Sequence, residues 1–396
     1  MFAFELGREF KLSLAEIFAV FPNGNTIFCD KKILILDGVS KEEILKNAKN
    51  LGGTIKIIEL KVSSHFINSI DKNEIIAKLE DILNENMGLN SFEGKFHYAI
   101  NIFGKFPLLH KEMLKISKKI IKEHSLNPRF INQDFKNISS VAIIKEALIK
   151  KETDFNFIYS DNKIYFGNTI FVQDIYGYSN RDYGKDRDMN IGMLPPKLAQ
   201  MMLNLAGGEV IYDPFVGLGT ILIEAIFSGN KKVFGSDLNE RMVKTANENL
   251  EKLNKNFNFD KKIILQNAKY ISEINFINEI DAIVTEGYLG EIMTKNNINI
   301  ERIEKQKIKL LDLYEGFFTG IKKLNFSGNI VICFPFWEMN GKFLYFEEIY
   351  DKLKEYFVVN KLLPETIEFS ETKAGSLLYK RDSQLVGREI FSLRLR

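Results

Sequence analysis

The stretch Asp213-Pro214-Phe215-Val216-Gly217-Leu218-Gly219-Thr220 decides the fold of this 396-residue chain. It begins within an apolar run typical of a buried strand (209–215) and precedes a helical pattern over 220–228. Gly217 and Gly219 let a ligand approach the backbone, and the helix that begins near Thr220 offers unpaired N–H groups at its positive end. A doubly wound α/β sheet presents its ligand crevice at such a strand-to-helix turn.

Strand and helix patterns alternate on both sides of this turn. A helical pattern at 195–206 precedes it, and strand-like runs at 231–237, 261–268, 281–287 and 328–336 follow it, with helices between them. Two last strand-like runs, 376–381 and 388–395, are expected to form an antiparallel hairpin. This order predicts a Rossmann-like, seven-stranded α/β sheet in which parallel strands are followed by the hairpin.

Asp237 stands twenty residues beyond Gly217, at the end of the next predicted strand. At that place a carboxylate can accept hydrogen bonds from both hydroxyls of a ribose. Leu222 occupies the position three residues beyond Gly219, so the loop lacks the third glycine of the dinucleotide fingerprint and NAD is the weaker choice. The spacing therefore predicts a cofactor that contains a nucleoside.

Composition excludes several classes of protein. The two cysteines, Cys29 and Cys333, are too few for a disulfide framework or a four-cysteine zinc site, and no cluster has metal-ligand spacing, so we expect no metal. The opening residues lack the apolar core of a secretion signal, and no apolar run nears the roughly 20 residues of a membrane span. We therefore expect a cytoplasmic protein that does not enter a membrane.

The first part of the chain follows a different pattern. Strand-like runs at 31–39, 53–62 and 95–103 alternate with helical stretches, which predicts an α+β region. From Lys111 to Lys151 there are ten basic residues against four acidic ones, although the whole chain has a net charge of only +2. Two interpretations are open: a solvated helix face, or a surface that follows nucleic-acid phosphates. In the second interpretation, the residues expected to bind RNA are Lys115, Lys118, Lys119, Lys122 and Arg129.

The glycine loop and the Ile-Leu-Ile-Glu-Ala that follows it resemble the S-adenosylmethionine loop of RNA methyltransferases, in particular the THUMP-containing tRNA guanine-N2 methyltransferases that act on position ten. Further stretches resemble that family: Tyr165-Phe166-Gly167-Asn168-Thr169, Gly192-Met193-Leu194-Pro195-Pro196 and Val386-Gly387-Arg388-Glu389. The resemblance covers nearly the whole chain, more closely after residue 160. It implies an N-terminal α+β subdomain at 1–50, a THUMP-like RNA-binding domain at 51–165, a linker at 166–194 and a class I methyltransferase domain at 195–396.

The resemblance also implies roles for single residues. The cofactor is S-adenosyl-L-methionine, whose methionine part falls to the loop residues Asp213, Pro214, Gly217, Gly219 and Thr220. Asp237 is the residue expected to bind the ribose, and Asn267 with Ala268 the residues expected to contact the adenine. The competing interpretation is that Asn267 is only a turn residue that ends a strand. The implied partner is tRNA, whereas an activating partner subunit cannot be read from the sequence.

The chain departs from the family after the fourth strand of the predicted sheet. Amino-methylating members carry Asp/Asn-Pro-Pro-Tyr/Phe there, whereas this chain reads Thr285-Glu286-Gly287-Tyr288-Leu289-Gly290. Methylation of a guanine amine needs acceptors for the amine hydrogens and an aromatic ring that stacks on the base. Glu286 can supply the acceptor and Tyr288 the ring, but the motif can be aligned in two registers. With Glu286 on the acid position, Tyr288 falls on the second proline and Leu289 on the aromatic; with Tyr288 on the aromatic position, Thr285 falls on the acid. Both registers stay open, as does a purely structural role for the loop.

Two functions compete at this point. The first is an active S-adenosylmethionine-dependent methyltransferase that acts on the exocyclic N2 of a guanosine in tRNA. The second is a catalytically silent tRNA- or RNA-binding protein that retains the methyltransferase fold, which the altered loop favours. Amine methylation on DNA or protein is a third, which the basic N-terminal region disfavours. Methylation of a pyrimidine ring carbon needs a cysteine nucleophile. Neither Cys29 nor Cys333 lies in the loop after the fourth strand, so the sequence does not support this reaction.

Overall fold

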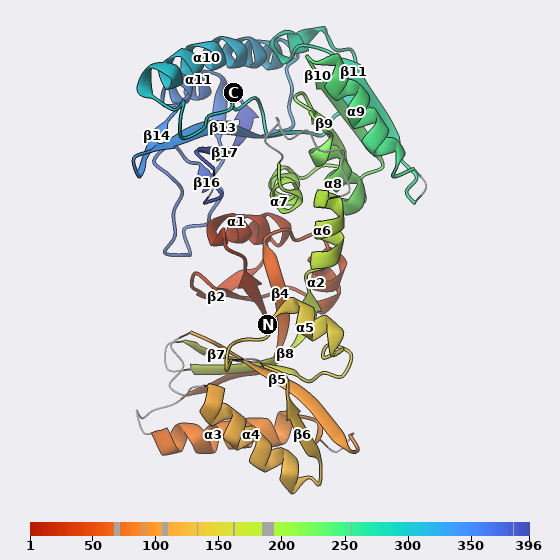
Figure 1. Cartoon of the computed structure of the whole chain (residues 1–396), viewed down its shortest axis with the longest axis vertical. Coiled ribbons are helices and arrows are strands. Elements are labelled where there is room, and N and C mark those ends of the chain that lie inside the picture. The colour runs from red at the N-terminus through yellow and green to blue at the C-terminus, as the bar shows by residue number, and fades with distance from the viewer. Residues whose placement is uncertain are drawn as a thin grey trace. The chain divides into compact units, whose positions relative to one another are not determined.

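The computed structural model describes residues 1–66, 72–89, 92–104, 110–132, 134–160, 163–183, 194–254, 256–382 and 384–396. The chain divides into two compact units, whose elements are labelled in Figure 1. The first unit comprises residues 1–10, 23–49 and 54–175, and the second comprises residues 11–22, 50–53 and 176–396. The second half of the expected linker, with Gly192 and Met193, lies outside the described residues.

The second unit is built on a sheet that has nine strands among the described residues. Seven of them follow the order β11-β10-β9-β12-β13-β17-β15, while β14 pairs with β13 and β16 with β17. The strands are β9 (Val210–Asp213), β10 (Lys232–Asp237), β11 (Asp260–Leu265), β12 (Ala282–Thr285), β13 (Asn329–Met339), β14 (Lys342–Tyr345), β15 (Phe357–Val359), β16 (Leu377–Tyr379) and β17 (Val386–Leu395). Strands β9 to β13 are parallel and β17 is antiparallel to β13, which confirms the predicted sheet and the predicted β16–β17 pair.

Helices cover both faces of this sheet. On one face α7 (Pro196–Ala206), α8 (Thr220–Ser228) and α9 (Glu240–Glu251) pack against the parallel strands. On the other face lie α10 (Ile300–Lys323) and α11 (Glu348–Tyr356). Successive side chains of β13 point to opposite faces of the sheet. The ring of Phe334 lies 4.8 Å from that of Tyr314 in α10, whereas Cys333 contacts Met202 of α7.

The N-terminal helix α1 (Phe10–Val20) belongs mainly to this second unit. Its buried Glu16 accepts hydrogen bonds from the backbone N–H groups of Gly52 and Gly53, at 2.7 and 2.8 Å, and from Asn204 of α7 at 2.7 Å. Burial raises the pKa of the Glu16 carboxyl to about 7, although these three donors favour its charged form. The carboxyl group of Glu16 in α1 thus links the Gly52-Gly53 segment to Asn204 of α7.

The first unit is built on a second sheet, with eight strands among the described residues in the order β2-β3-β1-β4-β8-β7-β5-β6. They are β1 (Phe2–Leu6), β2 (Asn25–Cys29), β3 (Ile33–Asp37), β4 (Thr54–Phe66), β5 (Lys95–Phe103), β6 (Asn127–Phe130), β7 (Asp154–Ser160) and β8 (Lys163–Val172). Strands β3, β4 and β5 are the three runs predicted from the sequence. Helices α3 (Lys72–Asn86) and α4 (His110–Glu123) share an apolar core with β5, β7 and β8.

The boundaries of the first unit differ from those expected from the sequence. Strand β8 crosses the expected boundary at residue 165, because it pairs with β4 on one side and with β7 on the other. The unit therefore continues to Ile175, where α6 (Ile175–Tyr183) begins. The expected subdomains 1–50 and 51–165 share this one sheet, in which β1 pairs with β4. In the described part of the chain no helix has both the length and the apolar composition to cross a bilayer.

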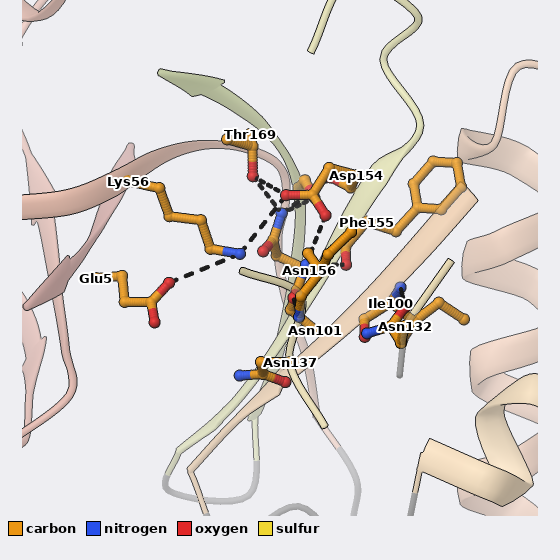
Figure 2. Close-up of polar contacts among 12 residues, drawn as sticks. Glu5, Lys56, Ile100, Asn101, Asn132, Asn137, Asp154, Phe155, Asn156 and Thr169 are labelled. Carbon is orange, nitrogen blue, oxygen red and sulfur yellow. Dashed lines mark hydrogen bonds and ion pairs between the residues drawn. The ribbon is translucent and has the colours of Figure 1, made fainter. Parts of the chain in front are cut away.

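A buried polar network runs through the middle of this first sheet (Figure 2). Lys56 on β4 is only 1% exposed, and its Nζ lies 3.5 Å from Asp154 Oδ2 and 3.7 Å from Glu5 Oε2. Asp154 also accepts hydrogen bonds from Asn101 Nδ2 at 2.7 Å and from Thr169 Oγ1 at 2.5 Å. The network joins β1, β4, β5, β7 and β8. It therefore links the expected subdomain 1–50 to the expected domain 51–165.

Lys56→Met is expected to destabilise the first unit by about 3 kcal/mol, because it leaves the buried Asp154 carboxylate without its cation. Native-state hydrogen exchange on the whole protein measures this as a loss of about 100-fold in protection of the β4 and β7 amides. Lys41→Met is the matched control, since Lys41 forms an exposed ion pair with Glu59 at 2.6 Å. Equal protection in the two variants would contradict a stabilising role for the network.

Candidate active site

The glycine loop lies between the end of β9 and the start of α8. Gly217 (φ 49°) and Gly219 (φ 82°) both adopt left-handed backbone conformations, which residues with a side chain rarely adopt. The Val216 N–H donates to the carbonyl of Ser236 on β10 at 2.8 Å, which fixes the loop to the neighbouring strand. Thr220 begins α8 and is buried, as is Pro214 at the other end of the loop. The loop therefore has no Cβ at its two glycines, and a ligand could approach the backbone there.

Asp237 ends β10 directly beside this loop. Its carboxylate accepts hydrogen bonds from the backbone N–H of Gly217 at 3.0 Å and from that of Asn239 at 2.9 Å. Burial raises the pKa of the Asp237 carboxyl, and these backbone donors partly offset the shift. Each carboxylate oxygen has a second lone pair, so Asp237 can hold the loop and still accept bonds from ribose hydroxyls.

Asn267 follows β11 at the same edge of the sheet. It is the N-cap of the short 3₁₀ helix η2 (Ala268–Glu273), and its side-chain oxygen accepts a hydrogen bond from the Lys269 N–H at 2.9 Å. Ala268 is buried in the second unit's core. The oxygen of Asn267 thus has the capping role of the competing interpretation, while its second lone pair and the amide NH₂ group can still bond an adenine.

Asp213 and Thr285 lie next to each other below the surface, at the ends of β9 and β12. The Thr285 hydroxyl donates to the Asp213 carboxylate, which also accepts from the Phe215 N–H at 3.0 Å. Burial raises the pKa of Asp213 to about 7, and nearby Asp237 and Glu286 add to the shift. The Thr285 oxygen also accepts from the Gly287 N–H at 3.1 Å, so its hydroxyl is engaged on both sides.

The loop after β12 carries the groups that face outward. Glu286 has 18% of its side chain exposed, and its Oε1 accepts a hydrogen bond from Arg388 Nε at 2.5 Å. The Tyr288 ring is 47% exposed, while its carbonyl oxygen accepts from the buried Tyr314 hydroxyl at 2.9 Å. Gly287 (φ 69°) makes the turn between them, and a Cβ there would come within 2.5 Å of Tyr314 Oη.

Sequence reasoning missed two residues of this site. Arg388 lies on β17 and Tyr314 in the middle of α10, each far along the chain from the loop it supports. Arg388 belongs to the quoted Val386–Glu389 stretch, which was a usable signal, whereas nothing in the sequence distinguishes Tyr314 from other core aromatics. Arg181 of α6 forms an ion pair with the buried Glu224 of α8 at 2.9 Å.

The predicted RNA-binding residues lie on the first unit. Lys115, Lys118, Lys119 and Lys122 are exposed along α4, and Arg129 is exposed on β6. Lys119 pairs with Glu80 of α3 at 3.2 Å. Within the described ranges, no acidic group forms an ion pair with Lys115, Lys118 or Lys122, so these three present unneutralised charge.

The strand order, the glycine loop and the acid at the end of β10 define a class I methyltransferase. Residues 184–336 match the model of the RMKL-like methyltransferase domain. The chain is 27% identical over 317 residues to the tRNA (guanine(10)-N2)-dimethyltransferase of Methanocaldococcus jannaschii, covering 74% of this chain and 81% of that protein. It is 37% identical over 117 residues to the probable tRNA (guanine(10)-N2)-dimethyltransferase of Methanothermococcus thermolithotrophicus, covering 27% of this chain and 68% of that protein.

The chain belongs to the tRNA (guanine(10)-N2)-dimethyltransferase family. Among solved structures it is similar to TrmN from Thermus thermophilus, with a TM-score of 0.54, 16% identity and coverage of 100% of this chain and 99% of that one. At that identity the likeness supports the fold alone. The sequence-based expectation of this family and of a class I sheet is confirmed.

Proposed function

We propose that this protein transfers a methyl group from S-adenosyl-L-methionine to the exocyclic N2 of a guanosine in tRNA, at position ten as in the names of its relatives. One observation carries the proposal most: Glu286 and the exposed ring of Tyr288 lie on the loop after β12, with Thr285 bonded to Asp213 of the glycine loop. An acceptor for amine hydrogens and a stacking surface thus lie next to the cofactor loop. These are the two groups that amine methylation needs.

The residues of the glycine loop fit the cofactor. S-adenosylmethionine, when bound, supplies a methyl group on a positively charged sulfur. Asp237 would accept from the ribose hydroxyls, and the open backbone at Gly217 and Gly219 would lie against the methionine part. Asn267 with Ala268 would line the adenine, and the acidic groups of Asp213 and Glu286 would favour a cation between them.

The acceptor step then depends on Glu286. Its carboxylate would accept a hydrogen bond from the guanine amine and keep the nitrogen lone pair directed at the methyl carbon. The N–C bond forms as the C–S bond breaks, and the proton that the amine loses passes to Glu286. The base must leave its helical stack to reach this position, and Tyr288 would hold it by ring stacking.

The burial of Thr285 supports Glu286 as the acceptor. The Thr285 hydroxyl already donates to Asp213 and accepts from Gly287, so it has little capacity left for a substrate. Glu286 keeps one carboxylate oxygen outside its bond with Arg388. We therefore propose the register that sets Glu286 in the acid position of the family motif. In this register Tyr288 stands at the second motif proline, so its ring would stack on the base from one position before the motif's aromatic.

The second candidate function is a catalytically silent tRNA-binding protein, favoured by the absence of both motif prolines. Transfer of tritiated methyl groups to an unmodified tRNA transcript separates the two. Incorporation that is lost when guanine ten is replaced by adenine supports the proposed function. Cofactor binding without any incorporation supports the silent protein. We further propose a cytoplasmic location, where the free thiols of Cys29 and Cys333 stay reduced.

We also propose that the THUMP-like region around α4 and β6 binds the tRNA through its phosphates. Replacing Lys115, Lys118 and Lys122 together by Gln is expected to reduce the slope of log K against log salt by about 2 to 3. Filter binding at several salt concentrations measures this, with cofactor affinity unchanged. The control replaces three exposed, ion-paired lysines of the second unit, Lys305, Lys354 and Lys361. An unchanged slope in the first variant would refute this surface.

A further inference from the structure

The Glu286 carboxylate is held from a strand far away in the sequence. Arg388 lies on β17, opposite Pro335 of β13, while Thr285 at the end of β12 lies opposite Ile332 of β13. Because β12 and β17 flank β13 on opposite sides, the loop after β12 and the start of β17 meet at the carboxyl edge of the parallel strands. The Arg388 guanidinium crosses β13 there and donates its Nε–H to Glu286 Oε1 at 2.5 Å.

The cation of this pair is buried more deeply than its partner. The Arg388 side chain is 2% exposed, against 18% for Glu286. Burial lowers the pKa of the Arg388 guanidinium, but the adjacent Glu286 carboxylate, with further contributions from Cys333 and Tyr379, raises it, and the net shift is upward. A buried ion pair contributes little stability beyond what an apolar pair of the same volume gives. Stability alone therefore does not account for an arginine at this position.

The pair leaves Glu286 half engaged. Arg388 also donates from Nη1 to Gln384 Oε1 at 3.3 Å, and its guanidinium lies 5.9 Å from the centre of the Tyr379 ring. In the described part of the chain, no donor is bonded to the other Glu286 oxygen, Oε2. One oxygen is thus fixed from below by a rigid, buried donor, and the other stays available at the partly exposed side.

The geometry points to Arg388 as a positioning residue that acts through Glu286, an inference that rests on the proposed function. Its guanidinium fixes Oε1 so that Oε2 faces the amine of the guanine. It also compensates the charge of Glu286, which stands close to the buried Asp213. Arg388 touches neither the cofactor nor the base in this scheme.

The test measures kcat at saturating cofactor and tRNA in the purified full chain. Arg388→Ala is expected to lower kcat by about 100-fold, as misplacement of a reacting group does, while KM for tRNA and cofactor affinity stay near their wild-type values. Added guanidinium ion at non-denaturing concentration is expected to restore part of kcat. Arg388→Lys, which retains a cation in the same pocket, is expected to retain more activity than the alanine variant.

Two controls distinguish positioning from a structural role. Arg394→Ala removes another arginine of β17, which donates to Asn329 at 3.1 Å and is exposed, and is expected to leave kcat unchanged. In a Glu286→Gln background, Arg388→Ala is expected to cost little further kcat, because its effect passes through the carboxylate. Where the alanine variant does not fold, Arg388→Lys is compared in both backgrounds instead.

The outcomes separate this inference from the function beneath it. Suppose that the wild type methylates tRNA. The positioning role alone is then overturned if the Arg388 variants keep the wild-type kcat, or if Arg388→Ala lowers kcat by the same factor in the wild-type and Glu286→Gln backgrounds. A wild type that binds cofactor and transfers no methyl group overturns the proposed function and the positioning role with it. Loss of kcat with guanidinium rescue, absent in the Glu286→Gln background, supports both.

Discussion

Glu286→Gln should lower kcat for methyl transfer to tRNA by about 10²–10⁴-fold, the range expected when a positioned acid–base group is removed. The amide can still accept from Arg388 through its oxygen, but its other atom becomes a donor that faces the amine hydrogens. The amine would then lose both its acceptor and the group that takes its proton. Single-turnover transfer of labelled methyl groups measures the effect, with cofactor affinity expected to stay unchanged.

Glu291→Gln is the matched control for this substitution. Glu291 is exposed five residues further along the same segment and pairs with Arg302 and Lys309 of α10 at 3.3 and 3.1 Å. Its replacement removes the same charge from the same segment without touching the buried site, and kcat should stay within a few-fold of wild type. If Glu286→Gln behaves like Glu291→Gln, the carboxylate is not the acceptor.

Asp237→Asn should weaken cofactor binding by about 100-fold, since charge-assisted hydrogen bonds contribute roughly 1.5–3 kcal/mol each. Two backbone N–H groups, of Gly217 and Asn239, already donate to this carboxylate. An asparagine has only one acceptor oxygen, so its NH₂ would face a backbone N–H and leave fewer lone pairs for the ribose. Titration calorimetry with S-adenosylmethionine measures the loss.

The control for this prediction lies in the neighbouring strand. Asp260 begins β11 and is exposed at the far end of the sheet, so Asp260→Asn should leave cofactor affinity unchanged. A thermal melt of both variants checks that the loop of Asp237→Asn stays folded. Wild-type affinity in a folded Asp237→Asn variant would show that the ribose lies elsewhere.

Local patterns in the sequence were sufficient to predict the second unit. The strand-to-helix turn at 213–220 contacts Asp237, which lies only twenty residues beyond Gly217. Because the contacting residues are close in sequence, their spacing was enough to predict that they lie side by side. Strands β14 and β15 were not predicted, because they have only four and three residues and little periodic pattern. Glu286 and Arg388 lie 102 residues apart and are brought together by the pairing of β13 with both β12 and β17, which no local pattern encodes.

The first unit was less predictable for a related reason. No strand was predicted from the opening residues, yet β1 pairs with both β3 and β4 inside the sheet. The assignment of β8 to that sheet likewise depends on partners more than a hundred residues away in β4. Long-range pairing of this kind decided the boundary near Ile175, whereas the family resemblance had implied one at residue 165.

The most direct test is mass spectrometry of the nucleosides of total tRNA after incubation with the purified protein and S-adenosylmethionine that carries a deuterated methyl group. The proposed function predicts deuterated N2-methylguanosine or its dimethyl form, and the Glu286→Gln variant should produce neither at a comparable rate. Cofactor binding without any labelled nucleoside, or a label on a nucleoside other than guanosine, would contradict it.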